Sequence, residues 1–154
     1  MATWIFILHM LVPLSGGLQA IEASADPRVT TTMIWNSGVF NAGTGVPGLS
    51  NATKASLALI HGPIAYFLGG PTDVAYPNGE DDYTRINQVP IFKGNLNVGH
   101  GGTYNQPGGG WFGEAAVAWL AWQLKGDRVA GRMFTGPNCG LCANPVWKVE
   151  KKGL

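Results

Sequence analysis

The sequence predicts an α/β fold: a three-layer sandwich in which helices cover both faces of a mostly parallel sheet. Short apolar runs alternate with helical patterns along the chain, which is typical of βαβ units. Each expected strand is a continuous run instead of an alternation of apolar and polar residues, and this indicates strands that are covered on both faces. The length of 154 residues suits one domain and is too short for two.

The first part of the chain contains two expected strands with a short helix between them. Ile5–Val12 is an apolar run of strand length, and Val29–Trp35 is rich in Thr, Val and Ile. Between them we expect a helix over Leu18–Ala25, ended by Asp26-Pro27 because proline disfavours helical backbone in the residue before it. The segment Asn41–Asn51 is dense in Gly and Pro and predicts a loop.

The middle of the chain repeats this alternation. Ala52–Ile60 predicts a short helix, and Ile64–Leu68 a third strand that is closed by Gly69-Gly70-Pro71. Asp81–Asn87 predicts one or two helical turns, and Pro90–Leu96 a fourth strand.

The clearest helix comes near the C-terminus. Its apolar residues recur at helical spacing and end at Gly126: Phe112, Ala115, Ala116, Trp119, Leu120 and Leu124. Asp127–Phe134 predicts a final short helix, and 135–154 a cysteine-containing tail. We expect the basic cluster of Lys148, Lys151 and Lys152 in that tail to be solvated.

Two interpretations of residues 1–17 stay open. Trp4–Leu14 is mostly apolar and small residues follow it, as in a secretory signal peptide over the first twenty residues. However, no Lys or Arg precedes the run, and Leu18-Gln19-Ala20 is a poor cleavage site. A buried strand explains the run equally well, and it is too short to span a bilayer as a helix.

The composition excludes some classes of protein. A hydrophobic share of 45% argues against disorder, and charged residues make up only 12% of the chain. The formal net charge of +1 leaves no concentrated positive field. We therefore expect neither nucleic acid nor a membrane as a partner.

Two residues with catalytic potential follow expected strands. Asp73 lies just beyond the third strand, and ligands of open α/β sheets bind outside the carboxyl ends of the strands. An Asx-turn or a helix N-cap would explain Asp73 equally well. His100 follows the fourth strand, and the glycines on both sides of it allow the imidazole to enter a cleft. This context favours a catalytic histidine.

Ser15 lies between an expected strand and an expected helix, in the sequence Pro13-Leu14-Ser15-Gly16-Gly17. This is the setting of a nucleophile elbow, with the G-x-S-x-G pattern matched at Ser15 and Gly17 but not at Pro13. The chain order of Ser15, Asp73 and His100 matches that of α/β-hydrolases. In such a triad the backbone N–H of Gly16 would be an oxyanion donor.

Several segments together resemble secreted-type α/β-hydrolases related to dienelactone hydrolases and esterases. They are Gly16-Gly17-Leu18-Gln19-Ala20, Gly69-Gly70-Pro71-Thr72-Asp73-Val74-Ala75-Tyr76, Val98-Gly99-His100-Gly101-Gly102-Thr103-Tyr104, the helix Ala115–Leu120 and the tail Cys139-Gly140-Leu141-Cys142. The resemblance implies that residues 1–154 form a single truncated hydrolase domain, the C-terminal half of an eight-stranded fold. Aligning the family pattern on Gly16-Gly17 places Leu14 at the nucleophile, so Ser15 fits only if one residue has been lost.

Cysteines and aromatic residues complete the candidate sites. We expect Cys139 and Cys142 to form a disulfide, because the tail has little apolar surface to anchor it and no second pair is present for zinc. Trp119 and Trp122 are expected in the core or at an interface. Four other aromatic residues are candidates for lining a substrate site: Trp35, Tyr76, Tyr104 and Trp111.

The leading hypothesis is a serine hydrolase that cleaves small-molecule or polymeric carboxylic esters, with no metal or organic cofactor. The alternatives are a non-catalytic hydrolase-like binding or assembly module, and a small secreted protein that loses Ser15 with its signal peptide. We expect a secreted or periplasmic location. A half-sheet exposes a strand edge, so a homodimer through that edge is also expected.

Overall fold

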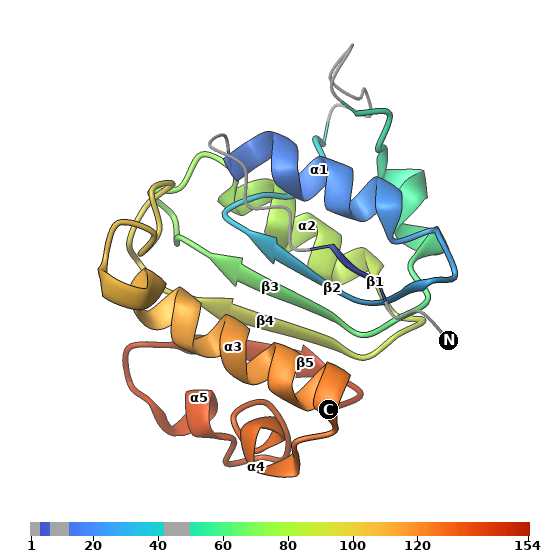
Figure 1. Ribbon diagram of the computed structural model, residues 1–154. Coiled ribbons are helices and arrows are strands. Elements are labelled where there is room, and N and C mark those ends of the chain that lie inside the picture. Colours follow the sequence, from blue (N-terminus) through green and yellow to red (C-terminus); the bar gives the residue numbers. More distant parts are fainter. Residues whose placement is uncertain (1–3, 7–12, 42–49) are drawn as a thin grey trace.

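The computed structural model describes residues 4–6, 13–41 and 50–154, with residues 4–6 and 13–15 described by their backbone alone (Figure 1). Its sheet has five strands in the order β1-β2-β3-β4-β5. β1 (Trp4–Phe6), β2 (Val29–Trp35), β3 (Ile64–Leu68) and β4 (Ile91–Asn95) are parallel, and β5 (Lys148–Lys152) is antiparallel to β4. The predicted α/β architecture with a mostly parallel sheet is confirmed.

Helices cover both faces of the sheet (Figure 1). One face carries α1 (Pro13–Ala23), the 3-10 helix η1 (Lys54–Leu59) and α2 (Tyr76–Arg85). The other face carries α3 (Gly110–Lys125), α4 (Arg128–Gly131) and α5 (Gly140–Ala143), with the short 3-10 turn η2 (Pro107–Gly109) before α3. None of the helices in the described ranges combines the length and the apolar character needed to cross a membrane.

The central strand explains why the apolar runs are continuous. Ile64, Tyr66 and Leu68 of β3 pack into the core beneath α1 and α2, whereas Ala65 and Phe67 pack into the core beneath α3. All five side chains are fully buried. Because successive strand residues point to opposite faces, a strand covered on both sides buries every side chain, and β3 accordingly has an apolar residue at every position.

The core beneath α3 is rich in aromatic residues. Trp119 lies edge-on to Phe134, with 5.1 Å between the ring centroids, and its indole N–H donates to Thr31 Oγ1 at 2.8 Å. Trp122 stacks on Phe134, with 6.0 Å between the centroids, and also lies edge-on to Trp119 at 5.4 Å. The predicted core position is confirmed for Trp119, which is fully buried, whereas Trp122 is partly buried and packs against this core.

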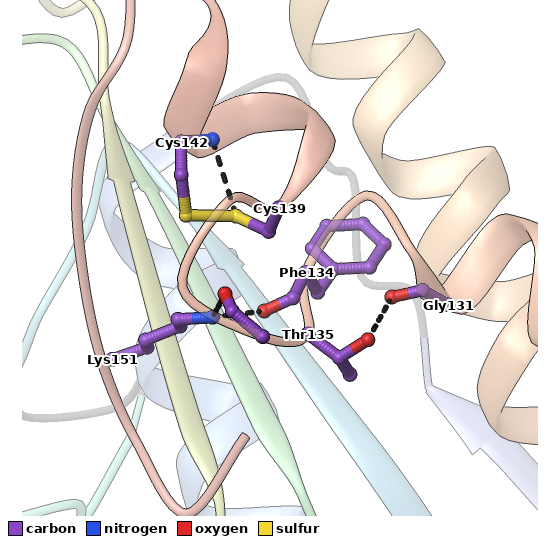
Figure 2. The surroundings of a disulfide bond; sticks show 7 residues. Gly131, Phe134, Thr135, Cys139, Cys142 and Lys151 are labelled. Carbon is purple, nitrogen blue, oxygen red and sulfur yellow. Dashed lines mark hydrogen bonds between the residues drawn. A yellow bond between two sulfur atoms is a disulfide. The ribbon is translucent and has the colours of Figure 1, made fainter.

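The C-terminal segment is structured, so the prediction of a solvated tail is wrong. Residues 148–152 form β5, which pairs with β4 along its whole length. Lys152 Nζ donates to the carbonyl oxygens of Tyr83 and Ile86 at the end of α2, at 2.6 and 3.0 Å. Lys151 Nζ donates to Phe134 O (Figure 2). An edge strand can be polar because neighbouring elements provide acceptors for its lysines.

Two helices begin earlier than predicted. α1 begins at Pro13 instead of Leu18, and α2 begins at Tyr76 instead of Asp81. Each has proline in its first two positions. Proline fits there because first-turn N–H groups have no acceptor within the helix. The earlier start of α2 brings it to within three residues of Asp73.

Candidate functional site

The carboxyl ends of β2, β3 and β4 lie at the same edge of the sheet, and the loops that follow them meet there (Figure 1). Asn36 follows β2, Asp73 follows β3, and His100 follows β4. The parallel register therefore brings together residues that are up to 64 positions apart in the chain.

Asp73 and His100 form a direct contact. Their Oδ1 and Nδ1 atoms lie 2.6 Å apart. The Asp73 side chain is fully buried, whereas the side chain of His100 is 32% exposed. Asp73 also accepts from the N–H of Ala75 at 2.9 Å and from that of Gly69 at 3.3 Å. The carboxylate thus closes an Asx-turn and contacts the histidine at the same time. The structural interpretation of Asp73 as an Asx-turn residue is therefore compatible with the catalytic one.

Close backbone packing of the two loops makes this contact possible. The N–H groups of Val98 and Gly99 both donate to Gly69 O, at 3.0 and 2.7 Å. A Cβ atom at Gly69 would lie 2.1 Å from Gly99 O, a distance that only glycine avoids. Gly99 itself has φ +72°, which favours glycine.

Asn36 holds the histidine loop from the neighbouring strand. Its amide Nδ2 donates to the carbonyl oxygens of Gly99 and His100, at 3.1 and 2.8 Å. Its φ of 42° is the only positive value among the described residues other than glycine. The side chain is fully buried. Asparagine tolerates this conformation better than most residues, so Asn at a strand end was the available signal, and the sequence interpretation missed it.

Thr103 fixes the other end of the same loop. Its hydroxyl donates to Gly109 O at 2.5 Å and accepts from the N–H of Phe112 at 3.1 Å. The side chain is buried. The loop that carries His100 is therefore attached to β2 at one end and to the start of α3 at the other.

The four predicted lining residues occupy different environments. Trp35 stacks on Tyr104, with 5.4 Å between their centroids, and burial together with the negative charge of Asp73 raises the pKa of the Tyr104 hydroxyl. Tyr76 instead lines a cavity of about 330 Å³, together with Pro71, Asn97 and Trp147. Trp111 is exposed on the first turn of α3.

Ser15 is described by its backbone alone, which belongs to the first turn of α1. As a nucleophile, Ser15 is expected to place its Oγ atom close to His100, but the side chain of Ser15 lies outside the described part of the structure. Gly16 is buried in the same turn. A Cβ atom at Gly17 would lie 2.2 Å from Ser37 Oγ, so α1 contacts the residue that directly follows Asn36. The start of α1 thus lies at the sheet edge that carries Asp73 and His100.

The predicted disulfide between Cys139 and Cys142 is present (Figure 2). Cys139 is the N-cap of α5, and its sulfur accepts from the N–H of Cys142 at 3.1 Å. Leu141 and Trp147 nearby are buried, so the premise that the tail lacks apolar anchors is wrong.

Within the described ranges, no three His, Cys, Asp or Glu side chains are grouped so that they could hold a metal ion.

Comparison with known proteins adds no relative: no family model matches this sequence, and no curated protein matches it.

Proposed function

We propose that this protein is a serine hydrolase that cleaves carboxylic esters through an acyl-enzyme. Ser15 is the nucleophile, His100 the general base, and Asp73 the residue that orients it. The observation that carries the proposal is the contact of 2.6 Å between Asp73 and His100. A buried carboxylate on Nδ1 of a partly exposed imidazole is the arrangement that activates a serine.

The tautomer follows from this contact. Asp73 accepts hydrogen bonds from two main-chain N–H groups, and its carboxylate can accept a further one from His100. Nδ1 then carries the proton, and Nε2 is left as an acceptor. As Ser15 Oγ attacks the ester carbonyl, Nε2 takes the hydroxyl proton and passes it to the departing alcohol. Water repeats these steps in the second half-reaction and releases the acid.

The oxyanion formed at the carbonyl needs a donor. We propose as this donor the backbone N–H group of Gly16, the fourth residue of α1. Such groups stabilise developing negative charge. The contact between α1 and Ser37 supports this role, since it sets the first turn beside the residues that hold the His100 loop.

A fluorophosphonate probe tests the proposal. We expect covalent labelling of the folded protein, mapped by peptide mass spectrometry to Ser15. Labelling should disappear in Ser15→Ala and in His100→Ala but persist in Ser56→Ala, a serine on η1 that caps its own helix. Failure of the folded wild-type protein to react would favour the alternative, a non-catalytic binding or assembly module. The replacement of the first elbow glycine by Pro13 is the observation behind that alternative.

We further propose export to an oxidising compartment and association into a homodimer. The disulfide supports export, because such bonds persist outside the reducing cytosol. β1 lies at one edge of the sheet, and pairing of two such edges would satisfy open hydrogen-bonding groups. Thiol titration of non-reduced, exported protein and sedimentation analysis test these two points.

A further inference from the structure

Exposed apolar side chains are concentrated around the Asp73–His100 pair. The described part of the chain has seven large apolar residues that are well exposed. Four of them stand at the sheet edge that carries the pair, with between 40% and 75% of each residue exposed: Val74, Val98, Trp111 and Val146. We call these four residues the apolar rim.

The rim residues come from segments that contact one another. Val74 directly follows Asp73, and Val98 donates its N–H to Gly69 O in the same turn at 3.0 Å. Val146 lines the cavity of about 330 Å³ together with Pro71 and Asn97 from these two loops. Trp111 lies one residue before Phe112, whose N–H is bound by Thr103 of the His100 loop.

Charge is nearly absent from this edge. Segments 69–75 and 96–113 contain no Lys, Arg or Glu, and their one acidic residue, Asp73, is paired with His100. Lys148 is the one charged residue that lines the cavity. A surface with few charges has little hydration to lose when it meets a neutral apolar phase. Exposed apolar surface of this kind is typical of interaction sites.

We propose that the apolar rim adsorbs the protein to the surface of a neutral, water-insoluble ester, such as a dispersed acylglycerol droplet. The inference deepens the proposed function and rests on it for the identity of the substrate class. Val74 and Val98 are 75% and 40% exposed and do not line the cavity, which suits contact with a surface better than contact with a dissolved molecule. The neighbouring cavity is at the small end of the range for ligand pockets, so most of a large ester would stay outside it.

Droplet adsorption tests the rim without requiring turnover. Tributyrin droplets are mixed with the folded protein and removed by centrifugation, and the protein left in solution is measured. We expect Val74→Asp and Val98→Asp each to lower the partition coefficient at least tenfold. The matched controls are Val117→Asp on α3 and Val129→Asp on α4, at residues 69% and 73% exposed but outside the rim. Both controls should bind as the wild type does.

Turnover separates this inference from the proposed function. Rim variants should lose hydrolysis of tributyrin droplets but keep hydrolysis of dissolved p-nitrophenyl acetate. Rim-dependent adsorption without turnover of either ester would retain the rim and overturn the proposed function. Hydrolysis of both esters, with equal adsorption by rim and control variants, would overturn the rim. Val74→Ser and Val98→Ser should also lower droplet adsorption. Because these two variants add no charge, they separate the loss of apolar surface from a folding defect caused by the aspartate.

Discussion

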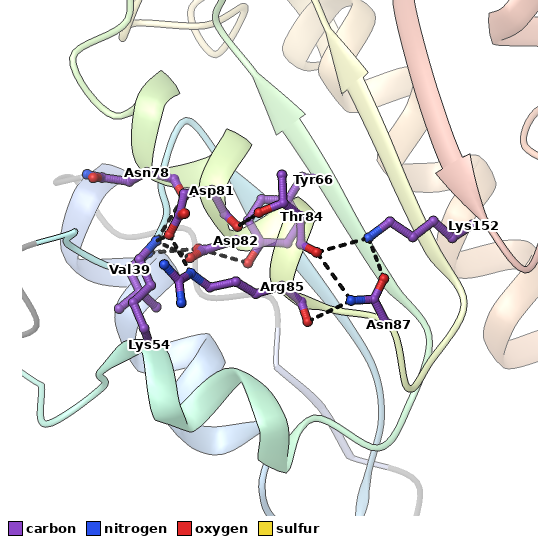
Figure 3. Close-up of polar contacts among 10 residues, drawn as sticks. All are labelled: Val39, Lys54, Tyr66, Asn78, Asp81, Asp82, Thr84, Arg85, Asn87 and Lys152. Atoms are coloured by element: carbon purple, nitrogen blue, oxygen red, sulfur yellow. Dashed lines mark hydrogen bonds and ion pairs between the residues drawn. The ribbon is translucent and has the colours of Figure 1, made fainter.

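Two buried aspartates, Asp73 and Asp82, occupy opposite kinds of site in this molecule. Asp82 accepts from Lys54 Nζ at 2.6 Å, from the N–H of Val39 at 2.8 Å and from the Tyr66 hydroxyl at 3.1 Å (Figure 3). All these donors belong to the interior, and Lys54 is only 12% exposed. Asp73 has two comparable main-chain donors, but its third partner is an imidazole that reaches solvent.

The two carboxylates differ in whether the groups bound to them remain accessible to solvent. Burial raises the pKa of Asp82, with Lys54 opposing the shift, and burial also raises the pKa of Tyr66. Every partner of Asp82 joins one element to another, so the network ties η1, β3 and the segment after β2 to α2. We therefore propose a chemical role for Asp73, whose imidazole partner is 32% exposed, and a structural role for Asp82, whose partners are largely buried.

Removing the imidazole should have the largest effect on activity. We expect His100→Ala to lower ester turnover by about a thousandfold or more, as for members of a triad, while the unfolding midpoint changes little. Initial rates with dissolved p-nitrophenyl acetate and a thermal melt check the two parts. Unchanged turnover in the variant would remove His100 from the mechanism.

Asp82→Ala should show the reverse pattern. The substitution leaves the Tyr66 hydroxyl without its acceptor and takes one of two carboxylate partners from Lys54, which keeps Asp81. We therefore expect a cost towards the lower end of the range of about 3 to 5 kcal/mol in the free energy of unfolding that is typical of a broken buried ion pair. Denaturant unfolding measures the loss. Below the midpoint of the variant, turnover by the folded fraction should equal that of the wild type. A selective loss of turnover would contradict the division between the two aspartates.

Asn36→Asp tests how tightly the His100 loop must be held. The substitution replaces the two donated hydrogen bonds by an acceptor that faces the carbonyl oxygens of Gly99 and His100. We expect turnover to fall by between about tenfold and a hundredfold, because small displacements of a catalytic group are costly. The proton NMR signal of the His100 Nδ1–H should also move. Asn36→Gly, which relieves the positive φ but lacks the amide, separates loss of the bonds from backbone strain.

The disulfide should matter less. The two cysteines are only three positions apart in the sequence, so the chain-entropy model predicts that the disulfide stabilises the fold by no more than about 2 kcal/mol. Chemical unfolding of the Cys139→Ser, Cys142→Ser double variant measures the difference. A collapse of the fold in that variant would show that Leu141 and Trp147 do not anchor the tail by themselves.

The smallest expected effect concerns Asp81, the partly exposed neighbour of Asp82. Arg85 and Lys54 lower its pKa from 3.8 to about 2. Since the folded state binds the proton more weakly than the unfolded state, this stabilisation is present above pH 3.8 and is lost as the pH falls towards 2. Surface pairs contribute less than about 1 kcal/mol. The difference in unfolding free energy between the wild type and Asp81→Asn should therefore shrink over that window.

Local sequence patterns predicted the features that depend on single segments. β2 and β3 have the predicted bounds: β3 is apolar and buried at every position, and β2 is rich in the β-branched residues Val, Thr and Ile, which favour strands. α3 ends before Gly126, which has φ +68° and is the left-handed residue that ends many helices. Asp73 and His100 could be paired in advance because parallel strands bring their carboxyl ends to one edge.

Other features depended on partners far away in the chain. The polar strand β5 exists because β4 offers it a hydrogen-bonding edge and α2 offers carbonyl oxygens to Lys152. Asn36 acquires its role from a loop 63 and 64 positions later, and Asp82 from Val39 and Lys54. Nor did the pattern show that Tyr76 faces a cavity whereas Trp35 packs on Tyr104. A hydrogen-bond donor or a charge has the same local pattern wherever its partner lies, and only the folded chain selects that partner.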